Sequence, residues 1–386
     1  MIWNKIYDQL ISEIVFNYKK LVKTYNVHYT NSNVEFETAF KINFITYLKA
    51  WVGILYYFFY NLKNQRIYFF ESFRNQEIIN LFDSKNILIL GGNNDKKIAT
   101  KNKYGFLWTS PIYSAILLAS SSKTTIPIKS FIYIFKYKFN KQKINFFLYE
   151  DTLPIGIFFS LLGKYFNKQT FCLQHGFGTK KEILFDGSLC KHNLLYSITQ
   201  KEFIEGDTKF YELGLPFDIN LPVEKSNEIV LIGTGWKGLD PEFYEKSLKY
   251  YNQIKEIFDK SNYKIFYRPH PNEKEIDYKS YNFNIDKKSK IECLSDTQKI
   301  FIGYISTLLY EAKVSNHLVI NIIDNKMNRL AFETDLSINP LYSVDFLKEI
   351  IYLYENKKIN NNQINSLKSR FFKIFDQIEN FQLPYD

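Results

Sequence analysis

Apolar residues follow two patterns along the chain. One is the helical period, and the other is the short continuous run that is typical of buried strands. Near the amino end, residues 5–25 and 36–62 follow a helical period, which predicts a helical N-terminal region. Short apolar runs predict strands at residues 66–70, 86–90, 144–149, 169–173, 194–198 and 210–213. Helical patterns predict helices at residues 111–119, 128–140 and 153–166. Alternation of strands with helices indicates a parallel sheet.

The alternation restarts after residues 216–227, which lack periodicity and carry two prolines among mixed charges. Beyond this segment, strands are predicted at residues 228–232, 263–267, 300–303 and 318–323, and helices at residues 241–258, 307–314, 343–354 and 365–379. We therefore predict an α/β protein with two Rossmann-like parallel-sheet domains facing a central cleft. The expected domains are residues 1–218 and 219–386, with extra helices at both ends.

Composition supports two hydrophobic cores and an anionic partner. The 386 residues are 46% hydrophobic, and 50 Lys+Arg against 40 Asp+Glu give a net charge of +10. This balance suits a polyanion, an anionic membrane surface or an anionic substrate.

The three cysteines show no CxxC spacing, so neither a disulfide framework nor a zinc site is indicated, and a reducing cytoplasm is expected. The apolar residues 50–60 fall short of the roughly 20 needed to span a bilayer, which predicts a buried or interfacial helix.

Residues 128–143 form a basic segment with an apolar helical face. That face carries Ile128, Ile132, Phe135 and Phe139, while Lys129, Lys136, Lys141 and Lys143 lie elsewhere. Such a helix either lies on an anionic bilayer or packs half-buried with a solvated lysine face. No recognition motif accompanies the charge, so nucleic acid is not an expected partner.

A histidine between two prolines follows the predicted strand at residues 263–267. The run Arg268-Pro269-His270-Pro271 must leave the sheet at a strand end and hold His270 in a rigid turn. The imidazole there can donate a hydrogen bond to a phosphate or leaving-group oxygen, or it packs as a core side chain. Glu273 lies near enough to order a ribose, or it caps a short helix.

A second strand end, at Ser306-Thr307, opens a helix on hydroxyl residues. Free backbone N–H groups and the positive end of the helix dipole favour an anion there, and an ordinary N-cap is the alternative. Glu311, one turn into that helix, meets a ribose or faces solvent.

The sequence Gly233-Thr234-Gly235-Trp236-Lys237-Gly238 matches GxGxxG between a predicted strand and a helix that begins at Asp240 and Pro241. The acidic residue expected after the next strand of a nicotinamide site is replaced by Arg268-Pro269-His270. A phosphate- or acceptor-facing loop is therefore favoured over a nicotinamide site, and a tight packing turn is the alternative.

Two candidates for a general base follow strands of the first predicted domain. Glu150-Asp151 precedes a helix, and a carboxylate there can deprotonate an acceptor hydroxyl, although Asp151 is also a plausible helix cap. His175, in Gln174-His175-Gly176, ends the next strand and is the competing base. The choice between Asp151 and His175 stays open.

Taken in order, these motifs resemble those of bacterial inverting glycosyltransferases of the GT-B fold. Residues 267–271, the unit at residues 301–312 and the acidic pair are similar to the motifs of CMP-sugar-dependent sialyl-, polysialyl- and Kdo transferases. The resemblance implies that Asp151 is the base and that His270, Ser306 and Thr307 bind the CMP phosphate. Thr152 stands where the family's acidic motif has glycine.

A second resemblance rests on Gln174-His175-Gly176 and on residues 212–218, followed by the same two downstream motifs. These are similar in order to CDP-glycerol glycerophosphotransferases, and this likeness implies His175 as the base.

The function expected from the sequence is inverting transfer from a nucleotide-activated sugar to a glycan or glycolipid acceptor, in capsule, O-antigen or lipooligosaccharide synthesis. Arg268, Gly233, Gly235 and Glu311 complete the expected donor site, no metal or other cofactor is expected, and the acceptor is assigned to the first domain. The expected location is cytoplasmic, with peripheral contact to the inner membrane. Glycerol phosphate transfer, sugar-nucleotide 2-epimerisation and an inactive polysaccharide- or lipid-binding subunit are the alternatives.

Overall fold

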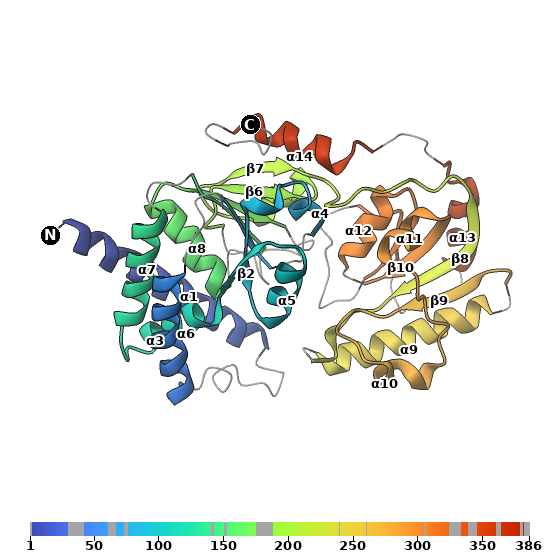
Figure 1. The fold of residues 1–386 in the computed structure, drawn as a ribbon. Coiled ribbons are helices and arrows are strands. Elements are labelled where there is room, and N and C mark those ends of the chain that lie inside the picture. Colours follow the sequence, from blue (N-terminus) through green and yellow to red (C-terminus); the bar gives the residue numbers. More distant parts are fainter. Residues whose placement is uncertain are drawn as a thin grey trace. The chain divides into compact units, whose positions relative to one another are not determined.

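The chain divides into two compact α/β units in the computed structural model (Figure 1). The structure describes residues 2–29, 42–60, 67–72, 76–139, 143–149, 153–174, 188–238, 240–259, 261–304, 306–323, 333–338, 346–359, 364–378 and 381. Among these, the first unit comprises the chain up to Phe217 together with the residues from Leu367 onward, and the second comprises the residues from Asp218 to Ser366.

The first unit is built on a seven-stranded parallel sheet in the order β3-β2-β1-β4-β5-β6-β7. Its strands are β1 (Tyr68–Glu71), β2 (Ile87–Gly91), β3 (Gly105–Trp108), β4 (Asn145–Leu148), β5 (Gln169–Leu173), β6 (His192–Leu195) and β7 (Lys209–Glu212). Its helices include α1 (Ile2–Tyr29), α3 (Phe44–Phe59), α4 (Gln76–Ile79), α5 (Asn93–Lys101), α6 (Ser110–Ser120), α7 (Ile126–Phe139) and α8 (Pro154–Tyr165). The first six strands have the order of a dinucleotide-binding sheet.

Alternate residues of these strands pack into cores on opposite faces of the sheet. Phe69 and Phe146 face the layer of α1, α3, α6, α7 and α8, whereas Phe70 and Phe147 face the other side. On that other side, the rings of Phe70, Phe147, Phe171 and His192 stack in sequence across β1, β4, β5 and β6, with centroid spacings of 4.7, 4.8 and 4.9 Å. The stack fixes the lateral order of four strands through side chains as well as hydrogen bonds.

The last helix, α14 (Leu367–Phe375), covers this second face. Leu367, Phe371 and Phe375 join the core formed by the strand residues Phe147 and Phe171. The expectation that all closing helices belong to the second domain is therefore wrong for α14. Its aromatic residues find a matching aromatic surface on the first sheet, and burial of that surface favours the return of the chain.

The second unit has a five-stranded parallel sheet in the order β12-β11-β10-β8-β9. Its strands are β8 (Lys225–Ile232), β9 (Lys264–Arg268), β10 (Gln298–Gly303), β11 (Leu318–Ile322) and β12 (Leu336–Ile338). Its helices are α9 (Pro241–Phe258), α10 (Glu275–Tyr278), α11 (Lys290–Ser295), α12 (Thr307–Val314) and α13 (Phe346–Asn356). From β8 the chain adds β9 on one side and later β10 on the other, so strand order reverses between β8 and β10.

Several elements differ from the sequence prediction. β8 begins at Lys225, inside the segment expected to be the linker. β3, β12 and α5 were not predicted, because β3 and β12 have four and three residues and α5 carries few apolar positions. Ile128, Ile132 and Phe135 of α7 are buried in the core, so the half-buried interpretation of that helix is confirmed for them. The side chain of Phe139 and the whole of Lys141 lie outside the described residues.

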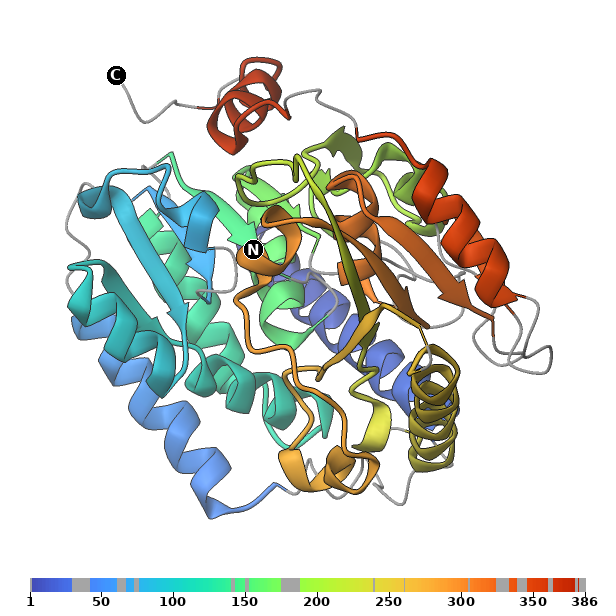
Figure 2. The same ribbon diagram turned by 90° about the vertical axis from the view of Figure 1, so that its right-hand side faces the viewer.

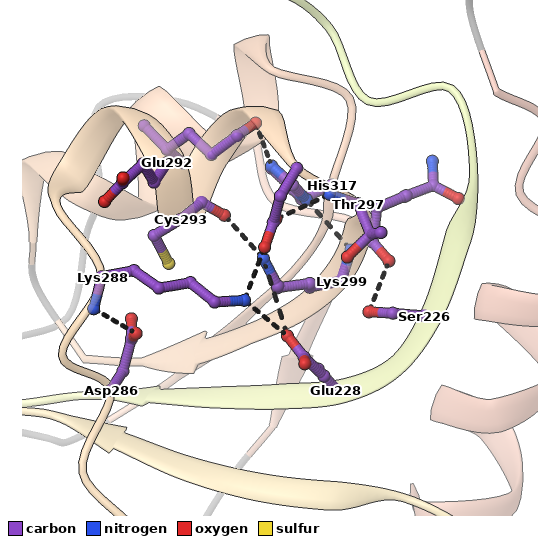
Figure 3. A network of polar contacts seen from close by, with 12 residues as sticks. Ser226, Glu228, Asp286, Lys288, Glu292, Cys293, Thr297, Lys299 and His317 are labelled. Atoms are coloured by element: carbon purple, nitrogen blue, oxygen red, sulfur yellow. Dashed lines mark hydrogen bonds and ion pairs between the residues drawn. The ribbon is translucent and has the colours of Figure 1, made fainter.

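A polar network ties together the amino ends of β8 and β10 and the helix α11 (Figure 3). Lys299 is 1% exposed, and its ammonium donates to the Cys293 carbonyl at 2.9 Å and to the Asp296 carboxylate. Lys288 adds a contact of 2.5 Å to the same carboxylate. The network lies at the end of the sheet opposite the glycine loop, and we assign it a structural role.

Candidate functional site

The carboxyl ends of β10, β8 and β9 lie side by side at the reversal of strand order. Gly303 is paired in register with Ile232, and Ile232 with Arg268, so the three strands end level with one another. Neighbouring strands are about 4.8 Å apart, which places the outer two ends roughly 10 Å apart. Open α/β sheets bind ligands at such an edge.

The glycine loop after β8 lies directly against the histidine turn after β9. Gly235 has φ +67°, and a Cβ atom there would stand 2.4 Å from Nδ1 of His270. A Cβ atom on Gly233 would stand 2.8 Å from the His270 backbone nitrogen. A side chain at either position would collide with the turn, so both positions require glycine, and the positive φ of Gly235 is a second reason at that position.

The predicted helix start is confirmed. Asp240 caps α9 by accepting a hydrogen bond from the Phe243 N–H, and Pro241 follows it.

His270 is half-buried in this turn with its ring oriented by the backbone. Its Nδ1 accepts a hydrogen bond from the Asn272 N–H at 3.2 Å, which places the proton of the neutral ring on Nε2. Burial lowers the pKa of His270 below its ordinary value, because the charged form loses hydration. At neutral pH the side chain is thus a neutral ring with an Nε2–H donor.

Glu273 joins the histidine turn to the glycine loop. One carboxylate oxygen accepts from the Gly235 N–H at 2.8 Å, and the other accepts from the Tyr267 hydroxyl at 2.7 Å. Its own N–H donates to the His270 carbonyl at 2.8 Å. Burial raises the pKa of Glu273, and the hydrogen bonds that it accepts oppose this effect. The carboxylate therefore holds the loop and the turn together, a role that sequence spacing did not reveal.

Two expected donor-site residues are committed to ion pairs. Arg268 donates to the Asp286 carboxylate at 2.6 Å and to the Lys288 carbonyl at 3.0 Å. Glu311 is buried rather than solvent-facing, and it accepts from the Lys290 ammonium at 2.9 Å. Burial raises the pKa of Glu311, while Lys290 and Arg268 act in the opposite sense. Both side chains are therefore held by other protein groups.

Ser306 and Thr307 open α12 immediately after β10. The Ser306 hydroxyl accepts from the Leu308 N–H at 3.2 Å, so Ser306 is the N-cap of the helix. Both residues are half-buried. The first turn of the helix therefore lies at the same edge as the glycine loop, with its backbone N–H groups at the positive end of the dipole.

The candidate bases Glu150, Asp151 and His175 lie outside the described residues. In the sequence they follow the carboxyl ends of β4 and β5, which are neighbours in the first sheet. Strand order in that sheet reverses between β1 and β4. Within the described part of the chain, no group of three or more His, Cys, Asp or Glu side chains is placed to hold a metal ion.

No protein-family model and no curated protein sequence matches this chain. Among solved structures, UDP-GlcNAc 2-epimerase from Methanocaldococcus jannaschii aligns with a TM-score of 0.50 and 11% identity, covering 81% of this chain and 99% of the epimerase. A glycosyltransferase from Rickettsia africae gives 0.49 and 14%, covering 82% and 100%. The wall teichoic acid polymerase TagF gives 0.45 and 12%, covering 87% and 93%. At these identities the likeness concerns the fold alone. The alignment with the epimerase and the two parallel sheets confirm the two α/β units predicted from the sequence as a GT-B fold.

Proposed function

We propose that this protein transfers a sugar from a nucleotide-activated donor to a glycan or glycolipid acceptor. The observation that carries the proposal is the joining of three sequence motifs at one sheet edge, where strand order reverses. The glycine loop, the His270 turn and the start of α12 all follow strands that end in register. The Nε2–H of His270 and the positive end of the α12 dipole favour an anion at this edge, which suits a nucleotide phosphate. The glycine loop holds the His270 turn in place through the Gly235 N–H, which donates to Glu273.

In this proposal His270 and the first turn of α12 bind the phosphate of the donor. The Nε2–H of His270 and the N-terminal amides of α12 stabilise negative charge as it develops on the leaving phosphate. Asp151 or His175 removes the proton from the acceptor hydroxyl, which attacks the sugar carbon in line, with inversion. Electrostatic stabilisation by these groups requires no metal ion in principle.

For the donor we propose a CMP-linked sugar of the sialic-acid or Kdo type. The support is the motif likeness of His270, Ser306 and Thr307 to CMP-sugar transferases. Capsule, O-antigen or lipooligosaccharide synthesis at the cytoplasmic face of the inner membrane is the corresponding setting. Transfer of glycerol phosphate from CDP-glycerol is the second candidate, favoured by the position of His175 after β5 and by the motif at residues 212–218.

The test is nucleotide binding by calorimetry with CMP, CDP and UDP, compared between the wild-type protein and His270→Ala. Loss of one hydrogen bond to a charged phosphate should weaken binding about tenfold to a hundredfold. The control is Ile276→Ala, which alters an exposed residue of α10 in the same segment. It should bind like the wild-type protein.

Equal affinity of His270→Ala and the wild-type protein would contradict the phosphate assignment. Turnover assays with CMP-sugar, CDP-glycerol and UDP-GlcNAc then separate sugar transfer, glycerol phosphate transfer and epimerisation. Binding of none of these nucleotides would support an inactive subunit instead. If His175→Ala abolishes turnover while Asp151→Asn retains it, the base is His175.

A further inference from the structure

Helix α3 exposes large apolar side chains along the whole length of one face. They include Leu48, Trp51, Val52, Leu55, Phe58 and Phe59, each between 46% and 76% exposed. Lys49 is the one charged residue in its sequence. A helix that is apolar all round is normally buried in a core or in lipid. Single exposed apolar residues need no explanation, but a helix-long group of them marks an interaction surface.

The opposite side of α3 anchors it firmly to the first unit. Thr46, Ala50, Gly53 and Tyr57 form its buried stripe. A Cβ atom at Gly53 would stand 2.1 Å from the Pro111 side chain, so glycine permits the close approach of α3 to α6. The Tyr57 hydroxyl donates to the Trp108 carbonyl. Because this side packs closely through Ala50 and Gly53, the bulky apolar side chains lie on the opposite side of the helix.

The length of α3 suits a position in the plane of a bilayer. Its 16 residues extend about 24 Å, less than the roughly 30 Å hydrocarbon core. In the described part of the chain, no helix has both the length and the apolar character that crossing a membrane requires. An apolar helix of this kind can bury its outer face at the boundary between headgroups and acyl chains.

The surroundings of α3 are basic and aromatic. The sequences of α3 and α7 carry lysines and no acidic residue. A hollow of about 540 Å³ beside α3 is lined by Ile54, Phe58, Lys129, Tyr133 and Lys136, among others. Lys129 also contacts Asp8 of α1 at 2.8 Å, which offsets part of this charge. Lysines and exposed aromatic rings next to an apolar face complement anionic headgroups above acyl chains.

We propose that the outer face of α3, flanked by Lys129, Tyr133 and Lys136 of α7, lies in the surface of an anionic bilayer. In Figure 2 α3 is the blue helix along the outer edge of the first unit. The sequence offered the apolar face of α7 as a membrane contact, but that face is buried. The proposed contact is therefore made by the outer face of α3. It depends on the geometry of the first unit and not on the donor site.

The experiment is flotation of the full chain with vesicles of phosphatidylcholine alone or mixed with phosphatidylglycerol. The triple variant Leu48→Ser, Val52→Ser, Leu55→Ser should lose binding to mixed vesicles by about tenfold or more, because it removes much of the inserting surface. The matched control is Val223→Ser, Ile276→Ser, Tyr352→Ser, which removes three exposed apolar side chains from the second unit. This control should bind like the wild-type protein.

A second measurement addresses charge and folding. Lys129→Glu, Lys136→Glu should weaken binding to the mixed vesicles and leave the circular dichroism spectrum unchanged. Wild-type binding by the triple serine variant would overturn the proposal, as would failure of the wild-type protein to bind any vesicle. A wild-type dimer that the triple variant converts to a monomer, without vesicle binding, would assign the face to a second copy of the chain and also overturn it. Nucleotide affinity is measured on the same variants as an independent readout. A negative vesicle result therefore does not bear on the proposed donor site, which nucleotide binding by His270→Ala tests.

Discussion

At the scale of single residues, Glu273 connects the His270 turn to Gly235 of the glycine loop, which lies 38 residues before Glu273 in the sequence. Its carboxylate contacts the Gly235 N–H and the Tyr267 hydroxyl, while its backbone N–H contacts His270. Each carboxylate oxygen thus accepts a hydrogen bond from another protein group. We therefore consider it a positioning residue for the glycine loop and for the imidazole.

We expect Glu273→Ala to weaken nucleotide binding by about tenfold, since one lost positioning hydrogen bond costs roughly 1 kcal/mol or more. Glu273→Gln retains an oxygen for the Gly235 N–H and should recover part of the affinity. Calorimetry measures both, with Glu275→Ala, exposed at the start of α10, as control. A purely structural role predicts a different result: lower thermal stability with unchanged affinity once the protein is folded.

At the scale of elements, the network at the amino ends of β8 and β10 centres on buried groups. His317 accepts the Lys299 N–H through Nδ1 at 3.0 Å and donates to the Leu294 carbonyl through Nε2 at 2.9 Å. Burial, together with the nearby Lys299 charge, lowers the pKa of His317 from 6.5 to about 3, although the Leu294 carbonyl and Asp296 act against it. The neutral ring therefore joins β10, β11 and α11 at neutral pH.

This arrangement predicts how stability depends on pH. The folded pKa is below the unfolded one, so the unfolded chain binds more protons between about pH 6.5 and 3. The contribution of His317 is complete above that range and is lost as pH falls, by up to about 1.4 kcal/mol per pH unit. Urea unfolding at several pH values should show a flatter dependence for His317→Gln. The exposed Lys287→Gln should keep the wild-type slope, and parallel curves for His317→Gln and the wild-type protein would refute the assignment.

At the scale of the whole molecule, the chain leaves the first unit after Phe217 and returns to it at Leu367. Arg370 of α14 donates to the Leu215 carbonyl at 2.7 Å and to the Phe217 carbonyl at 3.3 Å. The returning helix thus binds the backbone of the segment through which the chain departs. The first unit is therefore complete only once α14, which follows the second unit in the sequence, is in place.

We expect Phe371→Ala to destabilise the first unit by about 3–5 kcal/mol, as large-to-small changes of buried aromatic residues do. Hydrogen exchange measured by mass spectrometry should rise in β1, β4 and β5 and stay unchanged in β8 and β10. Lys373→Ala, exposed on the same helix, is the matched control and should leave exchange unaltered. Faster exchange confined to the second sheet would show that α14 belongs there instead.

The sequence by itself determined the class of fold and most of the strands. Buried strands such as β2 and β10 are short apolar runs ended by glycine, and this pattern is local. It also indicated His270, Gly233, Gly235 and Ser306 as residues at strand ends, because proline, glycine and hydroxyl residues have strong local preferences.

Only the tertiary structure decided which of those residues meet and what each one contacts. The packing of Gly235 against His270, the link through Glu273 and the diversion of Arg268 to Asp286 depend on strand order, which local periodicity does not contain. The same holds for α3 and α7. Both helices carry apolar and basic residues, yet the apolar face of α7 is buried and most of α3 is exposed. For α3, the close contact at Gly53 decides which side of the helix packs against the first unit.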